Sequence, residues 1–514
     1  MIRPHPLLLG LAFAFAILQI AAGWLGPYGL FHDELYYWAC AKRPGLGYVD
    51  NPPFSAWVLA GGMALLGDGL LVFEILPALC AAATVLLTGM MAGRLGAGPY
   101  GQSLAALGVI VAPFMLVLFS FYSLNAIELF LWSAAILLMV ELIRTGDRRL
   151  WIAIGAVAGI GLLNKHTFAL LLVGLAAGVV ATPLRAQLRT RWPWLAGALA
   201  LLLALPNVLW NFAHDWPSLA FYRSRPTVDL TASVGEALEL QVLGANPAAV
   251  LLWVPGTLSL LFSRRMRPYR AFGIAFLVLL VVILFSGQRR ADRIAGIYPI
   301  VLAAGATFWD QWRGRGHRAV RVVLLVTLVV FGALVVPATL PLFPPRAVAS
   351  YFEAIGNKPD IEKGDVGEGL PLYLLGRLEW ERFADDVVTA SNSLPADERA
   401  RAVVLAPHWV YASVVEYYGR GRGIPPVVAP HNAYWFWRDD AAGRDVVVSV
   451  AIEPEVLSRY FAETRPLGIF RCRHCSASRP DLPIHVAKKP VRPLVELLTE
   501  WRYFSIQAAP ALLR

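Results

Sequence analysis

The sequence predicts a mainly α-helical, polytopic transmembrane bundle followed by a C-terminal extramembrane α/β domain. Composition gives the first observation, because 57% of the 514 residues are hydrophobic and only 16% are charged, a balance typical of membrane-embedded chains. Long apolar stretches give the second, since they recur along the first two thirds of the chain. The third is a change to a soluble pattern after about Leu342. We therefore expect a membrane domain over residues 1–340 and an extramembrane domain over 341–514.

The apolar stretches approach the roughly 20 residues that a helix needs to cross a bilayer. They predict about eleven spans, with 151–163 crossing by close pairing with 166–182. The apolar, Gly-rich segment 53–66 is too short and is interpreted as an interfacial or re-entrant helix. The stretches expected to span lie at 7–25, 70–92, 102–120, 124–143, 151–163, 166–182, 193–209, 247–262, 271–286, 294–309 and 319–338.

Basic residues predict which loops face the cytoplasm, because Lys and Arg are retained on that side. With the N-terminus inside, every second loop is rich in arginine and the alternate loops carry almost no basic residues. The arginines of the cytoplasmic loops are then Arg94, Arg144, Arg148, Arg149, Arg185, Arg189, Arg191, Arg264, Arg265, Arg267, Arg270, Arg313, Arg315 and Arg318. An odd number of spans places the C-terminal region on the outer side. The net charge of +10 is therefore interpreted as a topology signal rather than as a nucleic-acid surface.

The region beyond about Leu342 has the alternation of helical and β-branched runs that is typical of an α/β domain. Strands are expected at 401–406, 445–452 and 482–487, and helices at 345–355, 395–401 and 409–418. Cys472 and Cys475 also lie here, and an oxidising compartment favours a local disulfide between them. A zinc site would need two further ligands, so no metal is assigned.

The stretch HDELYYWACAKRPGLGYVDNPP at 32–53 places acids and aromatics directly after the first span. Carboxylates at a bilayer surface are costly unless water, a partner or a reaction uses them. Adjacent residues of a helix point about 100° apart, so one of Asp33 and Glu34 can face a cavity while the other caps the helix. A carboxylate there could deprotonate an acceptor hydroxyl, and a capping and dipole role for the pair is the alternative. The prolines after Asp50 and Asn51 fix an extended turn that would aim both side chains at the same cavity, or serve only as a structural corner.

Two further polar groups are expected at the outer ends of spans. Asn125 and Glu128 share one helix face at the i, i+3 spacing, and an acid at that depth is a functional candidate. Lys165 and His166 occupy the break between two spans. The alternative is that Glu128 is a structural hydrogen-bond partner of Lys165 or His166, and that His166 is a packing residue.

The loop SGQRRADR carries Arg289, Arg290 and Arg293 on the outer side, against the usual charge bias. Guanidinium groups bind phosphate bidentately, and the Lys165 ammonium acts as a point charge. An anionic ligand would explain both basic groups. The alternative is salt bridging to Asp292 or to lipid head groups.

Taken together, these motifs resemble a known family. DELYYW, GYVDNPP, the acid of the fourth span, GLLNKH and SGQRRADRIAGIYP are similar to the polytopic GT-C glycosyltransferases of family 39, which include protein O-mannosyltransferases and lipid A aminoarabinose transferases. The similarity covers roughly residues 30–310. It implies a GT-C type bundle and the inverting transfer of one sugar from a polyprenyl-phosphate carrier to a lipid, glycan or protein acceptor. The implied location is the periplasmic face of a bacterial inner membrane.

The resemblance also implies roles for individual residues. Asp33 matches the first-loop acid of the family and is implied to be the general base. The basic cluster ahead of the Tyr298-Pro299 pair is implied to hold the departing phosphate. Asn51 stands where many relatives carry a different polar residue. The residues implied to bind substrate are Glu34, Tyr37, Asp50, Asn51, Asn125, Glu128, Lys165, His166, Arg289, Arg290, Arg293 and Tyr298.

The chemistry implied by these motifs requires no cofactor and no metal, because two or three basic side chains can neutralise a monophosphate. The sequence also carries no phosphate-binding loop and no dinucleotide fingerprint, so the donor is expected to come from the membrane. A transporter or flippase of lipid-linked sugar precursors is the alternative function. Transporters tend to show paired repeats and helices broken near the middle of the membrane, and neither is visible in this sequence.

Overall fold

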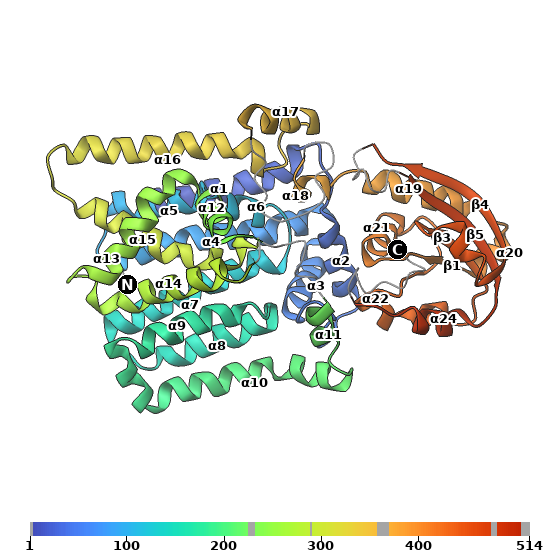
Figure 1. The fold of residues 1–514 in the computed structure, drawn as a ribbon, viewed down its shortest axis with the longest axis horizontal. Coiled ribbons are helices and arrows are strands. Elements are labelled where there is room, and N and C mark those ends of the chain that lie inside the picture. Colours follow the sequence, from blue (N-terminus) through green and yellow to red (C-terminus); the bar gives the residue numbers. More distant parts are fainter. Residues whose placement is uncertain (1–3, 225–231, 288–289, 357–369, 474–480, 505–514) are drawn as a thin grey trace. The chain divides into compact units, whose positions relative to one another are not determined.

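The computed structural model of the chain describes residues 4–224, 232–287, 290–356, 370–473 and 481–504. Contacts between residues divide the chain into two compact units. Figure 1 shows the chain coloured along the sequence. The helical unit consists of residues 1–27, 62–208 and 227–364. The mixed unit consists of residues 28–61, 209–226 and 365–514.

The helical unit is built from long apolar helices joined by short turns (Figure 1). Its α-helices are α1 (Pro6–Leu25), α4 (Leu70–Arg94), α5 (Pro99–Ile110), α6 (Pro113–Leu118), α7 (Leu124–Thr145), α8 (Leu150–Asn164), α9 (Phe168–Val180), α10 (Arg191–Ala213), α12 (Val234–Gly244), α13 (Val250–Phe262), α14 (Arg270–Leu284), α15 (Tyr298–Gln311), α16 (His317–Thr339) and α17 (Pro345–Ile355). Short 3₁₀ turns are η1 (Pro183–Arg189), η3 (Pro247–Ala249), η4 (Arg267–Tyr269) and η5 (Ala291–Ile297). The last residues of α10 belong to the mixed unit.

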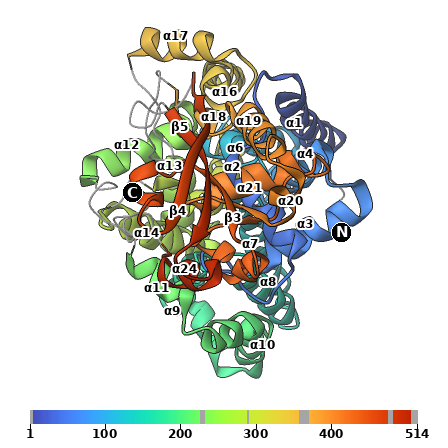
Figure 2. The same ribbon diagram turned by 90° about the vertical axis from the view of Figure 1, so that its right-hand side faces the viewer.

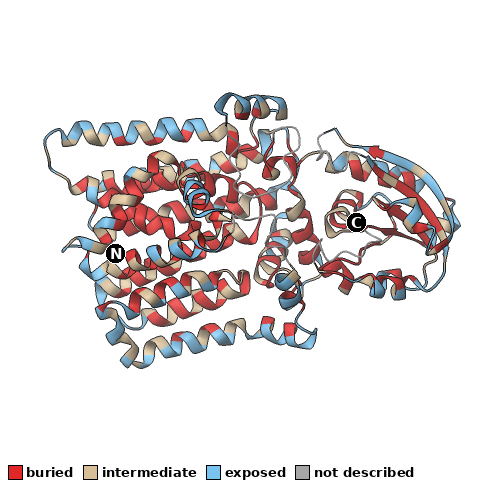
Figure 3. Cartoon of the chain, in the orientation of Figure 1, coloured by how far each residue is buried: buried red, intermediate tan, exposed pale blue. Residues whose placement is uncertain are grey.

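Six helices of the described residues are long and apolar enough to cross a membrane, or up to eight when each of two bent pairs counts as one span. Helices lie at every position where the sequence predicts a span, and the exact number of spans stays a prediction. In the most apolar window of α7, 67% of the residues are buried, against 17% in α16. In Figure 3, α16 carries few buried residues. The outer face of α16 is therefore available to lipid, whereas α7 lies inside the bundle.

The prediction of one continuous span over 102–120 is wrong in one respect, because this stretch forms two helices. Helix α5 ends at Ile110 and α6 begins at Pro113. Proline lacks a backbone N–H and clashes with the preceding turn, so it favours the first turn of a helix, which is the position of Pro113 in α6. The break places the chain between α6 and α7 at one end of the bundle, close to the residues of the candidate site.

Glycines allow two helices of the bundle to approach closely. A Cβ added at Gly256 of α13 would lie 1.9 Å from the carbonyl oxygen of Val301, and one at Gly305 of α15 would lie 1.9 Å from that of Leu252. Small residues at such contacts are typical of membrane helices, where packing rather than water exclusion drives association. The α13–α15 pair is therefore closely packed, and α15 also contacts η5.

The mixed unit contains one five-stranded sheet with the order β2-β1-β3-β5-β4. Strands β2, β1 and β3 are parallel, and β5 runs antiparallel to both β3 and β4. Figure 2 shows β3, β4 and β5 side by side. The strands are β1 (Ala402–Leu405), β2 (Val427–Val428), β3 (Val446–Val450), β4 (Phe461–Arg471) and β5 (Asp481–Pro490). The three predicted strands are confirmed as β1, β3 and β5, whereas β2 and β4 were not predicted.

Helices cover the sheet of the mixed unit. Leucines of α24 pack on Val403, Leu405 and Val447 of the sheet, and α19 packs against β3 and β4. The α-helices of this unit are α2 (His32–Lys42), α3 (Phe54–Leu66, whose last residues belong to the helical unit), α11 (Pro217–Ser224), α18 (Leu372–Leu375), α19 (Trp380–Asn392), α20 (Ala396–Ala400), α21 (Trp409–Gly419), α22 (Ala433–Phe436), α23 (Pro454–Leu457) and α24 (Leu494–Glu500), with the 3₁₀ turn η6 (Arg438–Ala441). The helices predicted within 341–514 are confirmed as α17, α20 and α21.

The stretch 32–53, which we call the first loop, packs with the C-terminal region. Helix α2 lies against α21, and both belong to the mixed unit. This grouping differs from the boundary at residue 340 that composition predicts, because composition records where polarity changes and not which segments touch. The division into 1–340 and 341–514 as folding domains stays a prediction. Cys472 is disulfide-bonded, and Cys475 lies outside the described residues.

Candidate active site

The first turn of α2 separates its two acids. The Oε2 atom of Glu34 accepts a hydrogen bond of 2.7 Å from the backbone N–H of Phe31, and Glu34 is fully buried. Glu34 therefore takes the capping role that the sequence left open. Asp33 keeps 34% of its side chain exposed, and its Oδ1 lies 3.2 Å from Nε2 of His32. The carboxylate of Asp33 is thus the more exposed of the two.

A second carboxylate of the first loop, Asp50, accepts hydrogen bonds from two uncharged side chains. The hydroxyl of Tyr36 donates to Oδ1 at 2.8 Å, and Nδ2 of Asn432 donates to Oδ2 at 3.3 Å. Burial and then the charge of Asp50 raise the pKa of Tyr36 well above its usual value, so the phenol keeps its proton. Asn51 is 2% exposed and Tyr37 is 8% exposed, so these two predicted substrate-binding side chains lie largely inside the mixed unit.

Asn432 reaches Asp50 from an unusual backbone conformation. Its φ is +48° and its ψ is −135°, a combination that residues other than glycine rarely adopt. The next N–H, from Ala433, points to the hydroxyl of Tyr36 at 3.4 Å. Strained backbone of this kind persists where the surroundings require it and is frequent at functional sites. The sequence contained no sign of this contact, because Asn432 lies 382 positions after Asp50.

An ion pair joins the first loop to the C-terminal region near the same place. Arg43 donates to Oε1 of Glu416 at 2.7 Å, and the hydroxyl of Tyr434 donates to Oε2 at 2.6 Å. The Arg43 guanidinium also lies 4.5 Å from the ring centre of Trp437. We call His32, Asp33, Tyr36, Asp50 and Asn432 the first-loop cluster.

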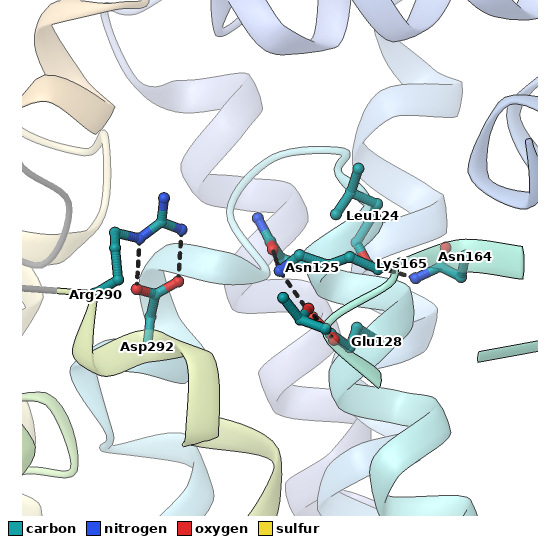
Figure 4. A network of polar contacts seen from close by, with 8 residues as sticks. Leu124, Asn125, Glu128, Asn164, Lys165, Arg290 and Asp292 are labelled. Atoms are coloured by element: carbon teal, nitrogen blue, oxygen red, sulfur yellow. Dashed lines mark hydrogen bonds and ion pairs between the residues drawn. The ribbon is translucent and has the colours of Figure 1, made fainter. Parts of the chain in front are cut away.

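In the helical unit, three predicted residues form one network (Figure 4). The Lys165 ammonium donates to Oδ1 of Asn125 at 2.6 Å and to Oε2 of Glu128 at 2.9 Å. The Thr167 hydroxyl donates to Oε1 of Glu128 at 2.6 Å. The structural pairing of Glu128 with Lys165 that the sequence offered as an alternative is therefore present. Burial in the bundle makes this pair costly to disturb.

The SGQRRADR loop supplies a second buried ion pair (Figure 4). Arg290 donates to both oxygens of Asp292, at 2.9 and 2.8 Å, which is the salt bridge that the sequence offered as an alternative. Burial alone would raise the pKa of Asp292, but Arg290, Lys165 and Arg293 together hold it below its usual value. Arg289 lies outside the described residues.

Both networks face one pocket, which has an empty volume of about 230 Å³ that includes open solvent. We call it the bundle pocket. Its lining combines residues of three separate sequence motifs: Leu118, Asn125, Glu128, Leu129, Trp132, Lys165, Asp292, Arg293 and Gly296. Among the described residues, its surroundings hold three basic side chains, Lys165, Arg290 and Arg293, and two carboxylates, Glu128 and Asp292. Such a pocket is suited to an anion.

Two residues predicted for this site lie elsewhere. Nε2 of His166 lies 3.2 Å from Oδ1 of Asn207. The hydroxyl of Tyr298 donates to Oε1 of Gln241 at 2.8 Å, and its ring packs among Phe114, Trp253 and Phe276. Neither side chain lines the bundle pocket, and a role of either in substrate binding stays a prediction. Thr167, which the sequence did not single out, directly follows the break and could have been noted for its hydroxyl.

Comparisons with known proteins agree with these observations. Residues 50–210 match the family of dolichyl-phosphate-mannose-protein mannosyltransferases. The chain is similar to the lipid A galacturonosyltransferase RgtD of Rhizobium johnstonii, with 29% identity over 36% of this chain and 39% of RgtD. It is also similar to an undecaprenyl phosphate-alpha-4-amino-4-deoxy-L-arabinose arabinosyl transferase of Pseudomonas fluorescens, with 26% identity over 56% of this chain and 54% of the relative. The chain thus spans less than two thirds of the length of these relatives.

Solved structures share the fold along most of the chain. ArnT from Cupriavidus metallidurans bound to undecaprenyl phosphate has a TM-score of 0.59 and 16% identity, over 94% of this chain and 97% of ArnT. The archaeal oligosaccharyltransferase AglB from Archaeoglobus fulgidus has a TM-score of 0.53 and 10% identity, over 88% of this chain and 70% of AglB. The predicted fold class and the predicted resemblance to GT-C glycosyltransferases are confirmed.

Proposed function

We propose that this chain, which resembles GT-C glycosyltransferases in sequence motifs and fold, is an inverting glycosyltransferase. It moves a single sugar from a polyprenyl-phosphate-linked donor to a hydroxyl of a lipid, glycan or protein. The names of its relatives support a lipid-linked donor, because the Pseudomonas relative carries undecaprenyl phosphate in its name and the ArnT structure contains undecaprenyl phosphate. We place the reaction at the periplasmic face of the bacterial inner membrane, with a cytoplasmic N-terminus and a periplasmic C-terminal domain, on the arginine distribution of the loops.

The bundle pocket is the observation on which the proposal depends. Among the described residues, three basic side chains (Lys165, Arg290 and Arg293) and two carboxylates (Glu128 and Asp292) lie in or next to this pocket. A sugar linked to polyprenyl phosphate is a phosphodiester and carries one negative charge. As the sugar leaves, the phosphate gains a second negative charge, and fixed cations near it stabilise that change most in a site that excludes water. Arg293 and Lys165 line the pocket and are the groups we assign to the phosphate.

Asp33 is assigned to the acceptor. A carboxylate in hydrogen-bond reach of a hydroxyl can remove its proton as the oxygen attacks, and such general-base catalysis contributes about 10²–10⁴-fold to rate. Attack by that oxygen on the anomeric carbon from the side opposite the phosphate inverts the configuration. Asp33 is suited to this role because its carboxylate is partly exposed while Glu34 is fully buried as the helix cap.

Purified protein in detergent tests the proposal, because transport has no meaning without a membrane. The donors are undecaprenyl phosphates linked to a uronic acid, a hexose and 4-amino-4-deoxy-L-arabinose, and the acceptors are lipid A and a total envelope extract. Mass spectrometry is expected to show loss of one donor with gain of one sugar on an acceptor, and NMR is expected to show the inverted anomer. Folded protein that consumes none of these donors would contradict the proposal and favour a transport role.

A further inference from the structure

His32 stands between the candidate base and the C-terminal region. Its Nε2 lies 3.2 Å from Oδ1 of Asp33, and its Nδ1 lies 3.2 Å from the backbone carbonyl oxygen of Gly376. All three residues belong to the mixed unit. Both ring nitrogens of His32 therefore face oxygen atoms.

The two oxygens define what the ring can do with a proton. A backbone carbonyl only accepts hydrogen bonds, so Nδ1 carries the hydrogen that bonds to Gly376. In the neutral ring this leaves the lone pair of Nε2 directed at Asp33. When Nε2 takes up a proton, the ring donates to both oxygens at once. Proton uptake at Nε2 therefore adds a hydrogen bond to the site, and histidine is suited to accept protons near neutral pH.

The imidazole ring is held in this orientation from several sides. Phe31, Trp380 and Trp409 lie against it, with ring centres 4.2, 6.1 and 5.9 Å away. A Cβ added at Gly376 would lie 2.6 Å from Nδ1 of His32 and 2.5 Å from the ring of Phe31. Only glycine lets the carbonyl approach the ring this closely. The side chain of His32 is 15% exposed, against 34% for that of Asp33, so the ring is the more enclosed of the two groups.

We propose that His32 accepts the proton that Asp33 removes from the acceptor hydroxyl, a role that depends on the function proposed above. The acceptor oxygen forms the bond to the anomeric carbon, and the bond from that carbon to the phosphate oxygen breaks with its electron pair on the phosphate. The hydroxyl proton passes to the Asp33 carboxylate, then to Nε2 of His32, and finally to water. Asp33 is thereby returned to its ionised form for the next turnover. His32 touches no substrate itself and is a positioning residue that acts through Asp33.

A packing role for His32 is the competing explanation, because its ring is surrounded by aromatic side chains and it is the first residue of α2. The two explanations differ in what glutamine can replace. Glutamine at position 32 retains a hydrogen-bond donor but accepts no proton at neutral pH. A packing role therefore predicts a small effect on catalysis, whereas proton transfer predicts that kcat falls while KM is retained.

The test compares H32Q and H32A with the matched control H317Q, which changes the histidine that begins α16. The assay uses the donor that wild-type protein consumes, so an inactive wild type identifies failure of the proposed function rather than of this inference. With active wild type, we expect kcat of H32Q to fall about 10–100-fold with KM within about twofold, and H317Q to match wild type. Added imidazole should restore much of the kcat of H32A, whereas pyrazole, of similar shape and much weaker basicity, should not. Wild-type kcat in H32Q, equal restoration by the two compounds, or restoration by neither would overturn the inference.

Discussion

The bundle pocket and the first-loop cluster both hold carboxylates, but in different ways. In the bundle pocket, Glu128 bonds to Lys165 and Asp292 bonds to Arg290. In the first-loop cluster, Asp50 accepts hydrogen bonds from Tyr36 and Asn432, which are uncharged. Removing one partner of a buried ion pair leaves the other charge uncompensated, whereas removing an uncharged donor costs one hydrogen bond and leaves no unpaired cation. Changes in the pocket should therefore affect folding as well as activity, and changes in the cluster mainly activity.

The largest effect is expected from K165M. This substitution removes the ammonium group that pairs with the Glu128 carboxylate, which is only 8% exposed. Breaking a buried ion pair costs about 3–5 kcal/mol. Thermal unfolding in detergent should therefore shift far downward. The double variant E128Q/K165M removes both charges and should recover most of the stability but none of the donor binding. Recovery of donor binding together with stability would show that the pair is only structural.

A smaller effect is expected from N432G. Glycine accepts the positive φ of position 432 at no steric cost, so the backbone should be kept while the hydrogen bond to Asp50 is lost. We expect kcat to fall about tenfold with little change in thermal stability, because one oriented hydrogen bond to a charged group is worth about 1.5–3 kcal/mol. N432A should lose the same bond and also be destabilised by strain. Wild-type kcat in N432G would remove Asn432 from the site and leave only the ion pairs of the pocket as functional contacts.

An effect of similar size depends on pH and concerns the mixed unit alone. Burial, and then the neighbouring His408, lower the pKa of His431 well below its usual value. The unfolded chain binds this proton near pH 6.5 while the folded unit does not. The free energy of unfolding is therefore unaffected by this residue above that pH. Below it, proton binding to the unfolded chain lowers the free energy of unfolding, by up to about 1.4 kcal/mol per pH unit. The variant H431F keeps a ring against Tyr503 and His408. Its thermal unfolding should depend less on pH than that of wild type between pH 7 and 5. An unchanged pH dependence would assign the effect to other histidines.

The smallest effect is expected for the Arg43–Glu416 pair, which ties the first loop to α21. Its side chains are 27% and 19% exposed, so a double-mutant cycle of R43M and E416Q should give a coupling of about 1 kcal/mol in thermal unfolding. The activity of both single variants should stay close to wild type. A large loss of activity with this small loss of stability would mean that the ion pair, and not only the neutral donors, orients the first loop.

Much of the fold could be predicted because it depends on local pattern. Long apolar stretches and β-branched runs identify helices and strands from neighbouring residues alone, which is why β1, β3 and β5 lie where they were expected. Strand β4 was missed because it lies at the edge of the sheet with most of its side chains exposed, so it lacks an apolar alternation. The break at Pro113 was missed because the apolar pattern continues through it.

The candidate site was predictable in part for the same reason. Acids and bases in apolar surroundings are conspicuous in a sequence, so Asn125, Glu128, Lys165 and Arg293 were singled out, and the pocket brings them together. Distant partners were not predictable. Asn432 and Gly376 are ordinary residues of the C-terminal region, and their importance comes from contacts with a loop more than 300 positions away.

The assignment of Asp33 as the base is tested by comparing the variants D33N and D397N. Asp397 is the matched control. Like Asp33, it is the second residue of a helix, and it is exposed. Donor consumption by folded D33N should fall about 10²–10⁴-fold, and D397N should match wild type. D33N that turns over donor at the rate of wild type would contradict the account.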